Sequence, residues 1–327
     1  MRVIRFRDAL REAMSEEMRR DERIFLMGEE VAEYNGAYKV SQGMLDEFGA
    51  KRIIDSPIAE LGFSGIGVGA AMNGLRPIIE FMTWNFAVLA ADQIINSARN
   101  MLQMSGGQYG CPIVFRGANG SAGQLGATHS NSYDAFYGQW PGLKVISVSN
   151  PYDAKGLLKS AIRDDDPVVF MEAEQMYSDQ GEVPEEEYLI PIGVAKVTRT
   201  GSDVTLIAWN KMLKVATEAA EALAKEGIEA EVIDPRTIRP MDYDAIVKSV
   251  KKTNRLIVID EAPPFGSVAA EISHIVQRRA FDYLDAPVVR VCGADTPVAY
   301  SPILVETYLP NAEKVVKAAK EIMYINK

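Results

Sequence analysis

A single carboxylate stands in an otherwise apolar and glycine-rich stretch of this sequence. The segment "DSPIAELGFSGIGVGAAMNGLRP", residues 55–77, contains Glu60, and no lysine or arginine follows it before Arg76. Ionised carboxylates are rarely buried unless a partner group pairs with them. Two interpretations are open for Glu60. It is either an acid in the first turn of a helix, where the helix dipole favours negative charge, or a carboxylate that meets a heterocyclic ring nitrogen in a dry pocket.

The two histidines are the next groups that could do chemistry. His129 lies in the glycine- and serine-rich segment "RGANGSAGQLGATHSNSYDAFYG", which follows the apolar run "PIVF". Loops after strands carry many binding and catalytic groups in α/β proteins, so a functional role and an exposed loop position are both open for His129. His274 has apolar neighbours in "AAEISHIVQRR", and we expect it to be a structural residue of a helix.

The remaining motifs argue against several classes of site. "GIGVGA" (residues 65–70) matches the dinucleotide pattern G-x-G-x-x-G/A, but no strand runs directly into it, so we expect its small residues to allow close helix packing. No P-loop or G-x-S-x-G motif occurs, and two histidines with two distant cysteines do not build a zinc site. The acidic "RDDDP" (163–167) is either a turn with an Asp cap or a hard-cation site built from backbone carbonyls.

The elements that must position these residues alternate along the chain. Short apolar runs predict strands at residues 23–28, 52–57, 76–84, 112–117, 143–150, 166–174, 203–209, 230–234, 255–262 and 287–293. Amphipathic stretches predict helices at residues 6–21, 60–73, 89–104, 151–164, 211–225, from 242 and after 266. Such alternation predicts an α/β fold with mostly parallel sheets covered on both faces. The acidic, proline-containing segment 177–201 breaks the rhythm and indicates two doubly wound domains, residues 1–190 and 191–327.

Composition excludes other classes of protein. The 327 residues carry 35 Lys and Arg against 45 Asp and Glu, and the formal net charge of −10 argues against a nucleic-acid or anionic-membrane partner. No apolar run approaches the ~20 residues of a membrane span. Two distant cysteines fit a reducing compartment. The start "MRVIRF" shows no targeting segment, so we expect the bacterial cytoplasm, or the mitochondrial matrix if the chain is processed.

Collinear motifs along the whole chain resemble a known family. They include "MGEEVAEYNGAYKVSQGM", "DSPIAELGFSGIGVGAAMNGLRPIIEFMTWNF", "DQIINSA", "PIVFRG", "HSNS", "PGLKVISVSNPYDAKGLLKSAIRDDDPVVFMEAE", "VIDPRTIRPMD" and "VIDEA". The chain resembles beta subunits of thiamine diphosphate-dependent pyruvate dehydrogenases, the decarboxylating first component of 2-oxo acid dehydrogenase complexes. The resemblance implies an N-terminal pyrimidine-binding domain and a smaller transketolase-type C-terminal domain. "EFMTWNF" is closer to the pyruvate branch than to the branched-chain or acetoin branches.

The resemblance assigns roles to residues of the N-terminal half. Glu60 matches the glutamate that hydrogen-bonds the aminopyrimidine ring of thiamine diphosphate, and His129 matches an active-site histidine. The positions that line the aminopyrimidine are Ile58, Met82 and Phe86. Glu29, in "MGEE", matches an acid of the tunnel that links two active sites. Carbonyl groups of five residues match a potassium site of mammalian-type members: Ile113, Ala161, Ile162, Asp164 and Asp166.

The resemblance also implies partners. The chain lacks the "GDG" segment with which thiamine enzymes hold Mg²⁺ and the diphosphate, so an alpha subunit must supply that half of the site in a heterotetramer of two alpha and two beta chains. The dihydrolipoyl acetyltransferase core is the further partner. Leu89 and Gln139 stand where many relatives have polar or histidine residues, which leaves His129 without a second imidazole. The alternatives are a non-catalytic assembly subunit and a nicotinamide-dependent dehydrogenase that uses "GIGVGA".

Overall fold

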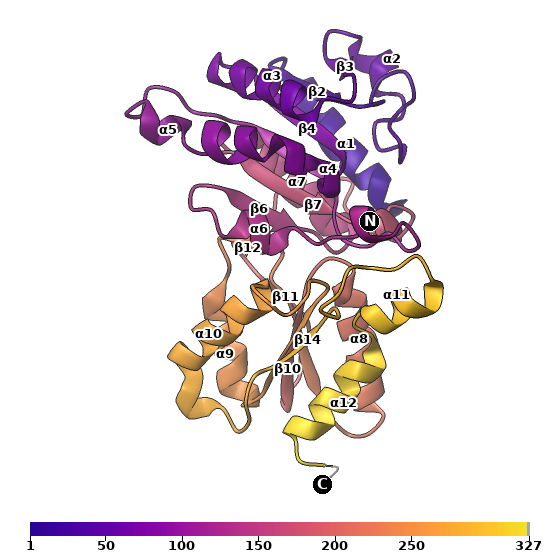
Figure 1. Ribbon diagram of the computed structural model, residues 1–327, viewed down its shortest axis with the longest axis vertical. Helices are drawn as coiled ribbons and strands as arrows, with labels where there is room; N and C mark the ends of the chain where they lie inside the picture. The colour runs from indigo at the N-terminus through magenta and orange to yellow at the C-terminus, as the bar shows by residue number, and fades with distance from the viewer. Residues whose placement is uncertain (326–327) are drawn as a thin grey trace. The chain divides into compact units, whose positions relative to one another are not determined.

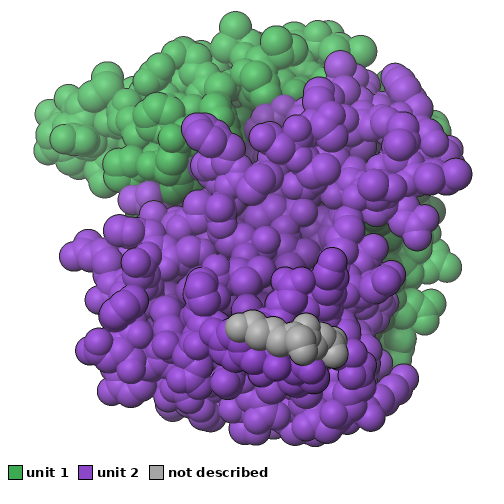
Figure 2. All heavy atoms as spheres, turned by 60° about the horizontal axis from the view of Figure 1, so that its bottom comes forward, with its two compact units in different colours: residues 1–119, 136–192 green, residues 120–135, 193–327 purple. Residues whose placement is uncertain are grey.

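The computed structural model describes residues 1–325 and divides the chain into two compact units. Unit 1 comprises residues 1–119 and 136–192, and unit 2 comprises residues 120–135 and 193–327 (Figure 2). The two expected domains, 1–190 and 191–327, differ from these units mainly in the segment 120–135. This segment contains His129 and packs with the residues of unit 2, although it lies in the first half of the sequence.

Unit 1 is built on a parallel sheet with the strand order β6-β7-β5-β4-β2-β3 (Figure 1). The bounds of its strands are β1 Arg2–Arg5, β2 Ile24–Gly28, β3 Ile53–Asp55, β4 Arg76–Thr83, β5 Val114–Ala118, β6 Lys144–Ser147, β7 Val168–Glu172 and β8 Gln180–Val183. Its helices are α1 Phe6–Arg20, α2 Met44–Phe48, α3 Glu60–Met72, α4 Trp84–Ala87, η1 Val88–Ala90, η2 Gln93–Ala98, α5 Met101–Met104, α7 Pro151–Arg163 and η4 Glu174–Met176. Strands β1 and β8 form a separate antiparallel pair.

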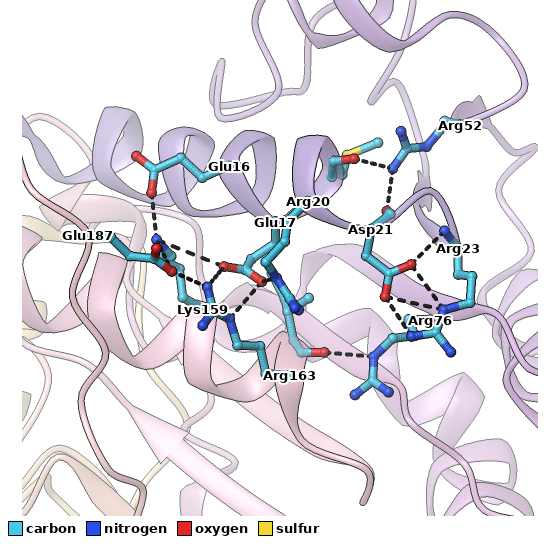
Figure 3. A network of polar contacts seen from close by, with 12 residues as sticks. Glu16, Glu17, Arg20, Asp21, Arg23, Arg52, Arg76, Lys159, Arg163 and Glu187 are labelled. Carbon is cyan, nitrogen blue, oxygen red and sulfur yellow. Dashed lines mark hydrogen bonds and ion pairs between the residues drawn. The ribbon is translucent and has the colours of Figure 1, made fainter.

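Ion pairs join helices α1 and α7 beside the apolar core of unit 1 (Figure 3). Lys159 of α7 is 1% exposed, and its Nζ lies 2.7 Å from an oxygen of Glu16 in α1. One turn further along α7, Arg163 lies 2.7 Å from Glu17, which is also buried. Such buried charges need close partners, because an unpaired ion loses its hydration without compensation. The pairs therefore fix the register of α1 on α7.

Unit 2 is a smaller α/β layer structure. Its sheet has the order β14-β13-β10-β11-β9, in which β9 is antiparallel to β11 and the other pairs are parallel. The strands of this sheet are β9 Lys196–Arg199, β10 Val204–Ala208, β11 Ala230–Asp234, β13 Leu256–Asp260 and β14 Val289–Cys292. The short strand β12 Thr237–Arg239 lies outside it. Helices α8 Met212–Ala224 and α12 Ala312–Ile322 cover one face, and α9 Tyr243–Thr253 and α10 Val268–Ala280 cover the other (Figure 1). The shorter helices are η3 Ala127–His129, η5 Phe281–Tyr283 and α11 Pro302–Tyr308, and α6 Asp134–Gly138 begins in the segment 120–135.

The expected alternation of strands and helices is confirmed, with two corrections. The helix expected over residues 89–104 is divided among η1, the π-helix η2 and α5. His274 is exposed, so the expectation of a structural histidine is wrong. The buried side of α10 is formed by Ile272 and Val276, four residues apart, and His274 falls between them on the opposite side of the helix. Within residues 1–325, no helix is long and apolar enough to cross a membrane.

Candidate functional site

The sheet of unit 1 brings four of the expected site residues to one edge. Strands β4, β2 and β3 are neighbours and parallel, with Gly28 of β2 paired to Glu80 of β4 and to Asp55 of β3. The carboxyl ends of these strands therefore meet at the same edge, which is where ligands of open α/β sheets bind. Glu29 follows β2, Glu60 follows β3, Met82 lies at the end of β4 and Phe86 lies in α4, directly after it.

Two buried carboxylates form the centre of this edge. Glu60 is the first residue of α3 and is only 4% exposed, and Glu29 is 6% exposed. Within residues 1–325, no lysine, arginine or histidine pairs with either carboxylate, and Oε1 of Glu29 accepts no hydrogen bond. Burial, together with the nearby negative charge of Glu60, raises the pKa of Glu29 to about 7. The pair is therefore a site at which one proton can be held near neutral pH.

The backbone around Glu29 is tightly constrained. A Cβ atom on Gly28 would lie 2.6 Å from the carbonyl oxygen of Glu80, so the close approach of β2 to β4 requires glycine there. Glu30 has a φ of 60°, a conformation that side-chain-bearing residues rarely adopt and that clusters at functional sites. The carboxylate of Asp55 accepts hydrogen bonds from the amides of Ala32 (2.7 Å) and Glu33 (3.0 Å), which fixes the loop after Glu29.

A buried cationic centre lies one strand away. Arg116 of β5 is 1% exposed and pairs with Glu80 of β4 and, through Nη2 at 2.5 Å, with Glu172 of β7. Tyr177 donates a hydrogen bond of 2.8 Å to Glu172. Burial raises the pKa of Glu80 despite the guanidinium beside it. This cluster was not predicted from the sequence, although a charged residue within each of the apolar strands "RPIIEFMT" and "PIVFRG" is a signal that could have indicated it.

The expected aminopyrimidine-lining residues differ in exposure. Met82 and Phe86 are half-buried, whereas Ile58, in the loop between β3 and α3, is 84% exposed. Leu89 is also exposed, and the exposed Gln139 donates a hydrogen bond of 3.2 Å to the carbonyl of Phe136. Exposed apolar groups beside a buried acid pair are typical of a site that a partner surface completes.

His129 belongs to unit 2 rather than unit 1. It is half-buried at the end of η3, and its Nδ1 lies 2.8 Å from Oγ1 of Thr128. The structure therefore groups Glu60 with Glu29 in one unit and His129 in the other. The joint action of His129 and Glu60 stays a prediction from the family resemblance.

The five residues expected at a potassium site lie in unit 1. Ile113 directly precedes β5, Ala161 and Ile162 lie in the last turn of α7, and Asp164 and Asp166 lie in the turn from α7 to β7. Several of their carbonyls already accept hydrogen bonds, for example those of Ile162 and Asp164 from the guanidinium of Arg76. Lys144 pairs with the side chains of Asp164 and Asp166 at 2.7 and 2.9 Å, and Asp164 also accepts the amide of Asp166. The side chains thus form a capped turn. This is one of the two interpretations that the sequence left open for residues 163–167. Within residues 1–325, no group of three or more His, Cys, Asp or Glu side chains is placed to hold a metal ion.

The glycines of "GIGVGA" lie inside helix α3. A Cβ atom on Gly67 would lie 2.7 Å from Cδ1 of Ile79 in β4, so this glycine allows the helix to pack closely on the sheet. A dinucleotide fingerprint needs its glycines in the turn between a strand and a helix. The packing interpretation is confirmed, and the nicotinamide-dependent alternative loses its only motif.

Comparisons with known proteins agree with this geometry. The family described as "Transketolase, pyrimidine binding domain" matches residues 2–180, and "Transketolase, C-terminal domain" matches residues 193–315. "Pyruvate dehydrogenase E1 component subunit beta" of Rhizobium meliloti is 54% identical over 99% of this chain and 71% of its own length. The protein of the same name from Rickettsia felis is 52% identical over 98% of each chain, and the mitochondrial one of Rattus norvegicus is 52% identical over 98% of this chain and 90% of its own.

The chain belongs to the family of pyruvate dehydrogenase E1 component beta subunits. This membership confirms the family assignment made from the collinear motifs. A solved structure titled "Split gene transketolase, inactive beta4 tetramer" covers 99% of each chain with a TM-score of 0.79 at 22% identity. That likeness confirms the two-domain α/β fold of the E1 beta family member. The acid pair Glu29–Glu60 lies within the region that matches the pyrimidine-binding family.

Proposed function

We propose that this chain is the beta subunit of an enzyme that decarboxylates pyruvate and reductively acetylates lipoamide, and that it forms the pyrimidine half of a thiamine diphosphate site. The single observation that carries the proposal is the buried Glu29–Glu60 pair, which no cation of residues 1–325 neutralises. A buried carboxylate without a cationic partner fits a ligand that offers a ring nitrogen and an amino group. The two carboxylates of the site therefore fit the aminopyrimidine of the cofactor.

Each residue of the edge has a distinct task in this proposal. Thiamine diphosphate supplies the electron sink for cleavage of the bond between the carboxylate and the carbonyl carbon of a 2-oxo acid. Glu60 would hold the pyrimidine ring through a hydrogen bond to its ring nitrogen, and its burial would keep water from competing for that bond. Glu29 can hold a proton near neutral pH, because its pKa is raised to about 7. Met82 and Phe86 supply apolar contacts to the ring.

An alpha subunit completes the site in this proposal. The chain has no "GDG" segment to bind Mg²⁺ and the diphosphate, so those groups must bind to another polypeptide. Apolar residues of unit 1 are exposed on the loop before α3, on α3 itself and on η1: Ile58, Leu61, Ile66, Val88 and Leu89. Exposed apolar groups of this kind are what a permanent partner covers. We also propose the dihydrolipoyl acetyltransferase core as the second partner and a cytoplasmic or mitochondrial-matrix location.

The decisive experiment compares Glu60→Gln with Glu33→Gln. Each variant is co-expressed with an alpha subunit that contains "GDG", purified as the assembled complex, and assayed for pyruvate decarboxylation with thiamine diphosphate and Mg²⁺. Glu33 is exposed on the loop after Glu29, so its variant should retain activity. Glu60→Gln should lose about 10²- to 10⁴-fold in kcat, the range for removal of a positioned acid–base group. Full activity of an assembled Glu60→Gln complex would favour the non-catalytic assembly subunit.

Two finer parts of the proposal have their own measurements. Turnover of 3-methyl-2-oxobutanoate without turnover of pyruvate would assign the enzyme to the branched-chain group, and turnover of acetoin alone to the acetoin group. If potassium binds to the carbonyls near Arg76, the Tm of the protein should be higher in potassium chloride than in sodium chloride of equal ionic strength. Equal Tm values would oppose a potassium site, since Arg76 already donates to two of its carbonyls.

A further inference from the structure

The segment 120–135, which carries His129, is held at its first turn by a buried ion pair of unit 2. Nζ of Lys211 lies 2.7 Å from Oε1 of Glu261, and the two residues are only 6% and 8% exposed. Both partners contact the backbone of Ser121. Its amide donates a hydrogen bond of 2.6 Å to Oε1 of Glu261, and its carbonyl accepts one from Nζ of Lys211. A single residue is therefore bound through both of its backbone polar groups by charged partners, which form the stronger class of hydrogen bond.

The contact between the carboxylate and the segment depends on glycine. Gly120 has a φ of +78°, and a Cβ atom on it would lie 2.3 Å from Oε2 of Glu261. The carboxylate thus lies directly against the backbone. At the middle of the segment, a Cβ atom on Gly126 would lie 2.5 Å from the ring of Tyr300, so that ring also packs against bare backbone. These two approaches hold the segment at its beginning and at its middle.

Hydrogen bonds within the segment connect these anchors to its second half. The amide of Gly120 donates to the carbonyl of Asn131 at 3.1 Å, and Oγ of Ser130 donates to the carbonyl of Gly126 at 2.7 Å. The amide of His129 donates to the same carbonyl at 3.3 Å. These bonds tie the start of the segment to Asn131 and the turn at Gly126 to His129, so we expect displacement of Ser121 to displace His129 as well.

The position of the charged pair in the sheet makes it a rigid support. Lys211 and Glu261 follow β10 and β13, which are adjacent parallel strands. A buried ion pair rarely adds net stability, because desolvation of the two charges offsets their attraction. Here both charged groups also bind the backbone of Ser121, so the pair holds that residue in one arrangement. Burial raises the pKa of Glu261 even beside Lys211, which shows that desolvation is the largest effect on this carboxylate. A costly arrangement of this kind is expected where the position of a neighbouring segment matters.

We infer that Lys211 and Glu261 are positioning residues for His129: they clamp the segment 120–135 on unit 2 so that the imidazole is presented in one place. The inference rests on the proposed role of His129 in the reaction. The role inferred for both residues is to hold the backbone of Ser121 and, through it, the segment that carries His129.

The test uses the assembled alpha–beta complex and three variants. Lys211→Met removes the charge and keeps an apolar side chain, whereas Lys211→Arg restores a cation. Glu261→Gln removes the negative charge but retains an acceptor for the amide of Ser121. Lys320→Met is the matched control, because Lys320 pairs with Glu226 at 2.6 Å elsewhere in unit 2. Hydrogen exchange of residues 121–131 and the kcat and KM for pyruvate are measured for each. Lys211→Met should raise exchange in the segment and lower kcat about ten- to a hundredfold, the effect of a misplaced group, with little change in KM.

The outcomes separate the clamp from the proposed function. Rescue of both exchange and kcat by Lys211→Arg supports the inference, and unchanged exchange in Lys211→Met and Glu261→Gln overturns it. Faster exchange with unchanged kcat also overturns it, because the segment would then be loosened without effect on the reaction. If Lys211→Met does not fold, Glu261→Gln gives the same readouts. The proposed role of His129 is tested separately by His129→Ala, whose full activity would refute that role whatever the exchange data show.

Discussion

Replacing Glu29 with glutamine should stabilise the isolated chain, and the gain should grow with pH. The pKa of Glu29 is raised from 4.5 to about 7, first by burial and then by the charge of Glu60. The folded chain therefore binds more protons than the unfolded chain between these two values. Its stability falls as the pH rises through this window. Glutamine has nearly the same shape and carries no charge at any pH, so the variant escapes this loss.

The size of the effect follows from the shift. The raised pKa corresponds to at most roughly 3 kcal/mol of stability lost by the wild type above pH ~8, a value that solvent screening lowers. At pH ~5.5 the loss is only about 1 kcal/mol, because Glu29 in the folded chain is then still protonated. The advantage of Glu29→Gln over the wild type should thus increase by about 2 kcal/mol between these two pH values.

Urea unfolding of the isolated chain at the two pH values measures this difference directly. Glu30→Gln is the matched control, because Glu30 is the exposed neighbour with the same side chain, and its variant should show no pH-dependent gain. The m-value should stay constant, so that a change in midpoint reports stability alone. An advantage of Glu29→Gln that is absent, or equal at both pH values, would refute the reasoning that the two acids are buried against each other at a cost. In the assembled enzyme we expect the same variant to be less active, since sites built for chemistry often trade stability for function.

Three further predictions test the structure around the site. Arg116→Met should destabilise the chain by about 3–5 kcal/mol in urea unfolding, because it leaves two buried glutamates without their cation; a loss below 1 kcal/mol would contradict the buried network. Gly67→Val should destabilise the isolated chain by about 1–3 kcal/mol, because the added side chain overpacks against β4. Gly69→Ala should instead stabilise it by about 0.5–1 kcal/mol, because a Cβ atom at Gly69 meets no atom within 4 Å. Cys111 is 2% exposed, and burial raises the pKa of its thiol to about 12. It should therefore resist alkylation by iodoacetamide at pH ~8 until the chain unfolds. Rapid alkylation of the folded chain would show that the thiol is accessible.

Local sequence patterns were sufficient to predict most of the fold. Apolar runs bounded by turn residues predicted the parallel strands of both sheets, since a parallel strand buried on both faces needs a continuous apolar run. They did not predict β9, an antiparallel strand of the second sheet that is mostly exposed. Helix α3 begins at Glu60, as the pattern predicts, and its glycines pack on Ile79 rather than bind a phosphate. The pattern failed at residues 89–104, where it gave no sign of the π-helix, and at His274, where apolar neighbours in sequence lie on the other face of the helix.

The candidate site was only partly predictable. Glu60 was noticed because one acid among apolar residues is unusual, and the family resemblance added Glu29. Their mutual burial could not be predicted, because it depends on the adjacency of β2 and β3, which the order of strands in the sequence does not determine. The pair Lys211–Glu261 was not predicted for the same reason: its members are far apart in sequence and meet only because β10 and β13 are neighbours.

The sequence by itself determined which segments become strands and helices and which family the chain resembles, because both depend on the types and spacing of neighbouring residues. Only the tertiary structure decided which charges share a buried environment. The free energy of a charge depends on the groups a few ångströms away and on the water excluded around it, and these are set by strand order and packing. The raised pKa of Glu29 and the inclusion of His129 in unit 2 are both consequences of that packing.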